Sequence, residues 1–443
     1  MTFSKPAQAL FCITCGLLAS LSVQAEDLLD IYRLALDSDP TYQAARASHQ
    51  AAVEVLPQSR AGLLPSLNAS GIASRDRFDP RNDNSTSYAT NQTYSLTLRQ
   101  PLYRRDRFIQ LQQADSRIAQ ADAQLTAAQQ ELVLRVATRY FLVLGLQDNL
   151  EFVRSDKTAL TSTLEQAQQR FEVGLAAITD QLKAQAAYDI AVSDEITAEQ
   201  QLADANEALR EVTGTVPQSL QVLQPDIPLL VPEPAELEPW VSAAVQQNPL
   251  MLVAQAAAES ARQEIQVQRS GHYPSVDVTA DYSYRDSQFG GTIPLQRNDS
   301  AIGLELNLPL YQGGLVNSRT RQQAQLYSEA LEQLEQQHRA TERQTRNNYR
   351  GIVSGISRVS ALARAIESNA KALEAAKSGF DVGTRDIVDV LDAQRELLRA
   401  RRDHARSRYD YLLDTLRLKQ AAGILEETDL AQINAWLVSG DKP

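Results

Sequence analysis

The chain repeats itself with an offset of 209 residues. Asp39-Pro40 aligns with Asn248-Pro249, and Phe171-Glu172-Val173-Gly174 aligns with Phe380-Asp381-Val382-Gly383. The register slips by one residue midway, where Gln100-Pro101-Leu102-Tyr103 meets Leu308-Pro309-Leu310-Tyr311. Such a repeat predicts one architecture that is built twice. A feature present in both halves is then structural, whereas a feature confined to one half is a candidate for function.

The first 25 residues have the features of a secretory signal peptide. Lys5 gives a short positive region, residues 9–23 are mostly apolar, and Val23-Gln24-Ala25 is a cleavage site of the small-x-small type. The apolar run is interrupted and short for a membrane span, which favours removal over anchoring. Both cysteines, Cys12 and Cys15, lie inside it. We therefore expect a mature chain without a disulfide, a thiol nucleophile or a cysteine-bound metal.

Each half contains two segments with the two-residue period of a β-strand. In the second half, residues 275–285 and 301–310 alternate between apolar and polar side chains along their whole length. In the first half, the alternation is weaker over 66–75, where Ile72 breaks phase, and clear in the strand expected at 93–101. Strands of about ten residues with one apolar face suit a tilted transmembrane strand, and they suit a half-buried sheet on a soluble core equally well. Polar segments at 76–92 and 286–299 predict loops between the strands of each pair.

After each strand pair the period changes to that of a long helix. Leu111, Ile118, Leu125 and Leu132 are seven residues apart, with alanines three residues after the first three, a pattern typical of close-packed coiled coils. The helix expected at 104–170 would span on the order of 100 Å, at about 1.5 Å per residue. The Gln, Ala, Glu and Arg content suits a wall one helix deep, although a soluble periplasmic coiled-coil scaffold is an alternative. Long helices are expected at 104–170 and 179–213 in the first half, and at 317–378 and 386–422 in the second.

The domain organisation follows from these patterns. Residues 1–25 form the signal peptide, 26–215 and 240–422 the two structural repeats, and 216–239 a proline-rich linker. We expect the C-terminal segment, 423–443, to pack on the helices. The formal net charge of −12 argues against nucleic acid as a partner.

Four strands per chain constrain the assembly if they lie in a membrane. Bacterial outer-membrane barrels begin at about eight strands, and an open edge in lipid leaves backbone groups unpaired. Several copies of the chain would therefore have to pool their strands, and the helices would continue the same tube. A porin that needs no partner is a further alternative, but porins use most of their length for strands, whereas this chain uses most of it for helices.

Three segments resemble the TolC family of outer-membrane efflux and secretion ducts. Residues 380–393 resemble the tunnel entrance of that family, 308–318 its strand-to-helix junction, and 170–180 the first-half counterpart of the entrance. The resemblance implies an α+β membrane protein in the outer membrane of a Gram-negative bacterium. It implies a homotrimer, in which a twelve-stranded β-barrel continues into a periplasmic α-barrel of twelve helices. It also implies cargo that arrives from an inner-membrane transporter through a periplasmic adaptor protein.

Asp389 and Asp392 match the carboxylates that ring the tunnel entrance in this family. They are three residues apart on one expected helix, so both face the same side. Three copies around an axis would bring six carboxylates to one constriction, which attracts cations. Lys183 stands at the second position in the first half, so the feature belongs to one half only. Two solvated aspartates on an exposed helix are the alternative.

The resemblance also implies polar links that hold the entrance closed. Thr179, Asp180 and Arg385 match these links, with a charge-assisted bond from Arg385 to Asp180 and Thr179 as a second acceptor. Phe380 stands where the family has a tyrosine, and a phenyl ring packs but cannot hydrogen-bond. We hypothesise a closed state that is held by fewer bonds and opens at a lower cost.

The turns between long helices are the expected docking surface for the adaptor. Both long helices end at a Phe-x-Val-Gly turn, where a helical hairpin exposes its tip. The docking residues are Val173, Gly174 and Leu175 in the first half and Val382, Gly383 and Thr384 in the second.

No arrangement of residues in the sequence predicts catalysis. His49, His272, His338 and His404 are scattered and lack partners at metal-ligand spacing, and Gly313-Gly314 lacks the lysine of a phosphate loop. We expect no enzymatic activity, no cofactor and no metal. The expected function is a passive export duct, closed at rest and opened by its partners. The sequence does not say whether its cargo is small molecules or proteins.

Overall fold

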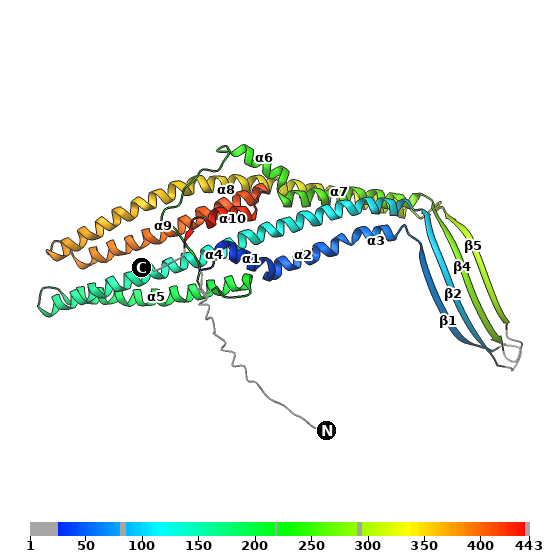
Figure 1. The fold of residues 1–443 in the computed structure, drawn as a ribbon, viewed down its shortest axis with the longest axis horizontal. Coiled ribbons are helices and arrows are strands. Elements are labelled where there is room, and N and C mark those ends of the chain that lie inside the picture. The colour runs from blue at the N-terminus through cyan, green and yellow to red at the C-terminus, as the bar shows by residue number, and fades with distance from the viewer. Residues whose placement is uncertain (1–24, 80–85, 218, 290–294, 439–443) are drawn as a thin grey trace, which may run out of the picture.

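The molecule is elongated, with a β-sheet at one end and the turns of two helical hairpins at the other (Figure 1). The computed structural model describes residues 25–79, 86–217, 219–289 and 295–438, so the expected signal peptide lies almost wholly outside it. Two helices, α4 (Arg105–Glu172) and α8 (Leu315–Asp381), run between the two ends. None of the helices in the described ranges is long and apolar enough to cross a membrane.

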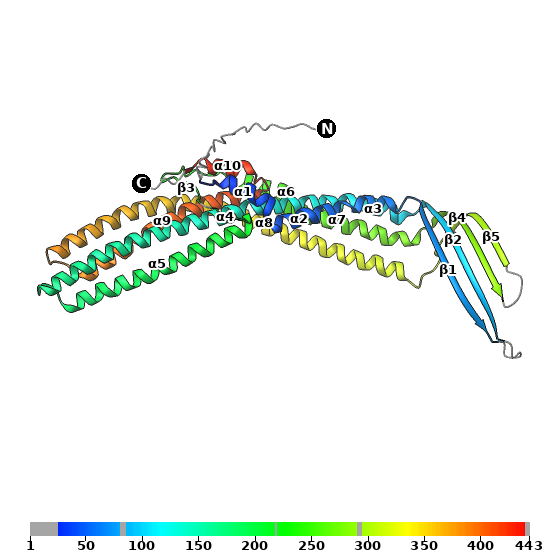
Figure 2. The same ribbon diagram turned by 60° about the horizontal axis from the view of Figure 1, so that its bottom comes forward.

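Shorter helices accompany the two long ones on either side of the middle. α5 (Ile178–Thr213) returns along α4 from one hairpin tip, and α9 (Ile387–Ala422) returns along α8 from the other. Beyond the middle, α2 (Pro40–Val53), α3 (Val55–Ala61) and α7 (Pro249–Arg269) continue toward the sheet (Figure 2). Each half of the chain therefore contributes one continuous helix and one interrupted line of helices.

The sequence specifies the interruptions at equivalent places of the repeat. Asp39 is the N-cap of α2, and its carboxylate accepts a hydrogen bond from a backbone N–H of the first turn at 2.7 Å. Asn248 caps α7 in the same way, at 2.9 Å. Pro40 and Pro249 follow at the first helical position, where the missing N–H of proline would be unpaired in any case. New helices therefore begin at both places.

A collar of short elements covers one side of the long helices at the middle of the molecule (Figures 1 and 2). It comprises α1 (Leu28–Ser38), β3 (Val222–Leu223), α6 (Leu237–Gln247), α10 (Glu427–Asn434) and β6 (Leu437–Val438). The strand β3 lies inside the expected linker and pairs antiparallel with β6. The linker therefore contributes structure to the collar, although its prolines predict none, and α6 begins within its last three residues.

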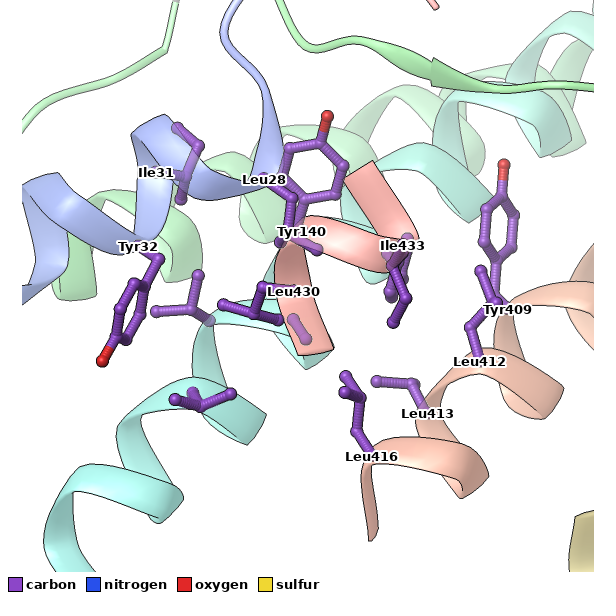
Figure 3. Close-up of a cluster of buried hydrophobic side chains, with 14 of the residues drawn as sticks. Leu28, Ile31, Tyr32, Tyr140, Tyr409, Leu412, Leu413, Leu416, Leu430 and Ile433 are labelled. Carbon is purple, nitrogen blue, oxygen red and sulfur yellow. The ribbon is translucent and has the colours of Figure 1, made fainter. Parts of the chain in front are cut away.

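The main hydrophobic core lies under this collar. Figure 3 shows side chains of α1, α9 and α10 converging there. Tyr140 of α4 is buried among them, and its hydroxyl donates to the carbonyl of Gln221 at 2.8 Å. Each fully buried leucine contributes about 2 kcal/mol relative to an exposed one, so the collar fixes the middle of the long helices. The core includes Leu28, Ile31, Tyr32, Leu412, Leu416, Leu430 and Ile433.

A column of alanines holds the first hairpin together. Ala184, Ala191, Ala198 and Ala205 are seven residues apart on α5, and all four are buried. A small side chain at every seventh position lets two helix backbones approach closely along their length. This spacing explains how two helices with few large apolar residues form a stable pair.

The sheet consists of β1 (Ser66–Phe78), β2 (Ser87–Tyr103), β4 (Ser275–Phe289) and β5 (Leu295–Asn307). It is antiparallel, in the order β1-β2-β4-β5. The register places Leu67, Leu98, Ala280 and Ile302 in one row across all four strands. On the opposite face the side chain of Thr97 donates to Asp281 at 2.7 Å. The two-residue period therefore separates an apolar face from a polar one in the part of the sheet nearest the helices.

The strands differ from the bounds that their alternation predicts. The strands expected at 66–75, 93–101 and 275–285 are all longer, and the one expected at 301–310 begins at Leu295 and ends at Asn307. The prediction that 76–92 and 286–299 are loops is wrong, because most of the described residues in these ranges belong to strands. Backbone hydrogen bonds pair these polar ends without any apolar alternation. Pro309 has no N–H for the ladder, which is consistent with the early end of β5.

A buried aspartate fixes the connection between sheet and helix. Asp277 of β4 is 3% exposed and accepts two hydrogen bonds from Arg104, at 3.0 and 2.5 Å. Arg99 of β2 lies 3.4 Å from the same carboxylate. Arg104 directly precedes α4, so this bidentate pair orients the long helix relative to the strands.

Candidate functional site

Both helical hairpins close with the same turn. Gly174 and Gly383 follow the ends of the long helices with φ angles of 76° and 78°. In the first turn the N–H of Gly174 donates to a carbonyl three residues earlier at 2.9 Å, and the N–H of Leu175 donates to one five residues earlier at 2.8 Å. The equivalent bonds of the second turn are 3.1 and 2.8 Å. These are the two bonds of a Schellman cap, whose positive φ is free of strain only for glycine.

The turns present apolar side chains to solvent. Val173 is 68% exposed, Leu175 79% and Val382 74%. All three lie at the end of the molecule that is farthest from the sheet (Figure 1). Exposed apolar residues that are gathered at one place mark an interaction surface.

The second hairpin continues into α9 with the two expected ring aspartates on its exposed face. Asp386 caps α9 and accepts from the backbone N–H groups of Val388 at 2.9 Å and Asp389 at 3.1 Å. Asp389 and Asp392 are both exposed, as their spacing predicts. Arg395 donates to Asp392 at 2.8 Å, an ion pair between exposed side chains that is worth little in water.

Phe380 packs between the hairpins, which explains how a phenyl ring serves at this position. It is 7% exposed and contributes to a cluster formed by both hairpins. Leu160 and Ala191 come from the first hairpin, and Ile387 and Leu391 come from the second. The ring therefore stabilises the contact by burial, without a polar group.

Arg170 joins the two hairpins, and the sequence analysis did not single it out. Its guanidinium lies over the ring of Phe380, with 4.5 Å between its central carbon and the ring centroid. It donates to the carbonyl of Phe380 at 2.9 Å and to that of Asp381 at 3.1 Å. Gln166, one turn earlier, donates to the carboxylate of Asp381 at 3.0 Å. These contacts place a cation at the C-terminus of α8, where the helix dipole favours positive charge.

A weak signal for Arg170 exists in the sequence. A basic residue four positions before a hairpin glycine lies in the last turn of its helix, and such residues often bond unpaired carbonyls. The signal does not reveal that the carbonyls belong to a different helix, some 210 residues away in the chain.

The expected gate links are near the same tip but are not joined within one chain. Thr179 and Arg385 are exposed, and Asp180 is half-buried. Among the described residues, no hydrogen bond or ion pair connects Arg385 to Asp180 or to Thr179. The stem of Arg385 lies against Gly379, where an added Cβ would come within 3.0 Å of its Cγ and Cδ atoms. The link stays a prediction, and its acceptor would come from another copy of the chain.

The two hairpins also meet along α4 and α9, where two carboxyl groups are partly buried. Tyr409 donates to Asp148 at 2.7 Å, and Gln394 donates to Asp156 at 2.8 Å. Burial raises the pKa of both aspartates, and these hydrogen bonds partly counter that effect. The contact between the hairpins is therefore polar and titratable as well as apolar.

Residues 31–215 and 240–424 each match the sequence profile of the outer membrane efflux protein family. The chain is 40% identical over 423 residues to the outer membrane protein TolC of Vibrio cholerae, with 94% of this chain and 95% of that protein covered. It is 35% identical over 428 residues to TolC of Escherichia coli, with 94% and 86% covered. It is 28% identical over 427 residues to the alkaline protease secretion protein AprF of Pseudomonas aeruginosa, with 94% and 88% covered.

Solved structures share the fold. The outer membrane protein VceC of Vibrio cholerae has a TM-score of 0.75 at 21% identity, over 89% of this chain and 96% of that one. CusC has a TM-score of 0.76 at 18% identity, over 89% of this chain and 92% of that one. At such identities the likeness concerns the fold alone.

Proposed function

The chain belongs to the outer membrane efflux protein family, and on this premise we propose how it works as an export duct of the Gram-negative outer membrane. Three copies pool their strands in a twelve-stranded transmembrane β-barrel, and their helices form a periplasmic α-barrel of twelve helices. The duct is passive, with no enzymatic activity of its own. Its likeness to an alkaline protease secretion protein supports proteins as cargo alongside small molecules.

The sheet is the observation that carries this proposal. Its four strands present one apolar face, and in the described residues β1 and β5 each pair on one side only. Unpaired backbone groups at two edges are too costly for lipid, so the sheet needs further strands. Three copies of four strands exceed the minimum of about eight for a closed outer-membrane barrel.

The hairpin tips form the entrance of the duct, and it is closed at rest. Phe380 and Arg170 hold the second hairpin against the first within each chain. Arg385 of one copy bonds to Asp180 and Thr179 of the next, which closes the ring of hairpins. Opening therefore requires that partners replace these contacts, and the lack of a tyrosine hydroxyl at Phe380 lowers its cost.

The partners are a periplasmic adaptor and an inner-membrane transporter. The adaptor docks on the turn residues, because their exposed apolar side chains lie at the end opposite the sheet. Photo-crosslinkers at Leu175 and at Val382 should capture the adaptor. An adaptor that a bifunctional reagent still crosslinks to the duct after both turns are replaced would refute this placement.

Single-channel current in a planar bilayer tests the duct and its entrance ring together. The purified protein should give small, cation-selective currents, because Asp389 and Asp392 of three copies face one constriction. The double substitution Asp389→Asn/Asp392→Asn should bring the K⁺ to Cl⁻ permeability ratio close to one. Asp37→Asn, at an exposed position of α1 in the collar and away from α9, is the control and should preserve selectivity.

The outcomes separate the alternatives. Large, nonselective currents from both proteins would leave a duct or a porin but discard the ring. Failure to insert, together with release from membranes by salt alone, would favour a soluble coiled-coil scaffold.

A further inference from the structure

Beyond the ring aspartates, the exposed face of α9 becomes mainly basic, although Glu396 and Asp403 also lie on it. The exposed stripe that begins at Asp389 and Asp392 continues at spacings of three and four residues toward the middle of the molecule. Over the next four turns the chain places four exposed arginines along or beside it. They are Arg395, Arg399, Arg402 and Arg406.

Three of these arginines, Arg399, Arg402 and Arg406, border a cavity between α9 and α4 together with Arg417. The cavity has a volume of about 670 Å³, within the range of small-molecule sites. A neighbouring cavity of about 170 Å³ shares Arg399 and Arg402 with it, so the two form one groove between the hairpins. Four arginines and two aspartates line the larger cavity, which makes it cationic in a chain whose net charge is −12.

The inner side of the same cavity is apolar and rigid. Phe141 and Tyr409 stack with ring centroids 5.7 Å apart, and both are buried. The hydroxyl of Tyr409 is held by Asp148 at 2.7 Å, which fixes the ring. Figure 3 shows Tyr409 and Leu413 on one side of α9, at the edge of the main core. Leu142 and Phe152 of α4 complete the apolar lining.

Arg402 is the arginine that is available to a ligand. Arg399 is paired with Glu396 at 3.0 Å, and Arg406 lies 3.7 Å from Asp410. Within the described residues Arg402 has no carboxylate at ion-pair distance, although it lines both parts of the groove. Asp156 interacts with Arg402 electrostatically but does not reach ion-pair distance, so the guanidinium can still bind an anion. Such a group beside a stacked aromatic floor favours a ligand that carries an anion on an apolar body.

We propose that this groove binds small anionic amphiphiles, molecules with one carboxylate or sulfonate on a rigid apolar body. The apolar body lies on Phe141, Tyr409 and Leu142, and the anion is bound by Arg402. This inference rests on the proposed function, because it names a class of small cargo: in the assembled duct this face of α9 continues the face of the entrance ring.

Fluorescence titration of the full mature protein in lipid nanodiscs tests the site. The probes are 8-anilinonaphthalene-1-sulfonate and N-phenyl-1-naphthylamine, which share an aromatic body and differ in the sulfonate. Arg402→Gln should weaken binding of the sulfonate about tenfold and leave the neutral probe unchanged, because a hydrogen bond to a charged group is lost. Arg401→Gln, an adjacent exposed arginine that lines neither cavity, is the matched control and should change neither affinity. Leu142→Trp, at an exposed lining position, should obstruct the cavity and weaken both probes.

Equal losses in the Arg402 and Arg401 variants, or no loss in the Arg402 variant, would overturn the proposal. So would an equal loss of the neutral probe in Arg402→Gln. The conductance measurement separates failure of this proposal from failure of the duct. If the channels conduct normally but Arg402→Gln does not change the affinity for the sulfonate probe, the groove alone is refuted. Absence of channels with Arg402-dependent binding would refute the duct and retain the site.

Discussion

At the scale of the residue, the guanidinium of Arg170 makes three contacts with the end of α8 at once. It stacks on the ring of Phe380 and donates to two successive carbonyl groups, at 2.9 and 3.1 Å. A flat group with several donors in fixed directions can do this, whereas a lysine ammonium cannot. The geometry also explains why Phe380 functions without a hydroxyl, since its ring is the platform for the arginine.

Arg170→Lys should therefore loosen the closed entrance. The loss of one charge-assisted bond and of the stacking costs about 1.4 kcal/mol, which raises the ratio of open to closed channels about tenfold. Single-channel recordings of the protein alone, without adaptor or transporter, measure this ratio directly. Arg154→Lys is the matched control, because Arg154 binds Glu195 and Glu199 within the first hairpin. Among the described residues it has no hydrogen bond or ion pair to the second hairpin.

Phe380→Tyr extends the same measurement. The added hydroxyl should lower the current through the closed channel, if the closed state of the parent is held by fewer bonds than that of the variant. A higher leak in this variant, or equal leak in the Arg170 and Arg154 variants, would contradict the account of the gate.

At the scale of the element, Gly423 determines how closely two helices approach end to end. It follows α9 with a φ of 79°, beside the start of α7. A Cβ at this position would lie 2.4 Å from the carbonyl oxygen of Gln247 and 2.8 Å from the N of Asn248. Gly214 ends α5 in the first half with a φ of 74°, but its nearest neighbour would be 3.5 Å away.

Gly423→Ala should thus destabilise the protein more than Gly214→Ala. Both variants carry the strain of a left-handed alanine, about 1 kcal/mol, and only the first adds a backbone collision that costs about 2 kcal/mol more. Thermal unfolding followed by far-UV circular dichroism would show this as a larger fall in Tm. Equal shifts for the two variants would mean that the ends of α9 and α7 separate freely.

The contact between α4 and α9 should depend on pH through Asp156. Burial raises the pKa of Asp156 above its ordinary value of 3.8, so the folded state binds the proton more tightly than the unfolded state. Its contribution to stability is then complete below about pH 4 and is lost as the pH rises through the folded-state pKa. Asp156→Asn cannot ionise, and its amide can donate to Oε1 of Gln394, a buried atom that has no partner.

Asp156→Asn should unfold at a higher temperature than the parent protein at pH 7, which corresponds to a gain of about 1 kcal/mol in the free energy of unfolding. Near pH 3.5 the two proteins should unfold at the same temperature. Calorimetry at the two pH values checks it. Asp204→Asn, at an exposed position on α5 farther from Asp156, is the control and should show no such difference. A gain for Asp156→Asn that persists at pH 3.5 would rule out ionisation as its cause.

Elements differ in how far the sequence predicts them. The long helices begin and end within three residues of their expected bounds. The reason is a local signal at the hairpins: Val-Gly follows the ends of α4 and α8, and Asp-Ile begins α9. The strands extend past their expected ends, because pairing across β1, β2, β4 and β5 depends on partners far away in the chain. The exposure of the turn residues can also be predicted from the local sequence. The contact between Arg170 and Phe380 cannot, because it depends on how two hairpins pack.

At the scale of the whole molecule, the repeat produces a near-symmetric body with a function at one end only. Both hairpins have the same glycine turn, which is structural. Asp180 of the first hairpin aligns with Asp389, but Lys183 stands at the position of Asp392. The pair of carboxylates and the arginines that follow it therefore occur in the second hairpin alone. The sequence could predict this asymmetry from the repeat, but the groove beside Arg402 required the structure, since its walls come from α4 and α9.

The interrupted helices have a mechanical consequence. Of the helices in the described ranges, α4 and α8 alone pass the middle without a break, while α5 and α9 end where α2 and α7 begin. Rotation applied at the hairpin tips reaches the sheet as torsion of these two rods, and the collar clamps both of them halfway. In the proposed duct, untwisting of the periplasmic half can then stop at the collar, so that the strands keep their arrangement while the entrance opens.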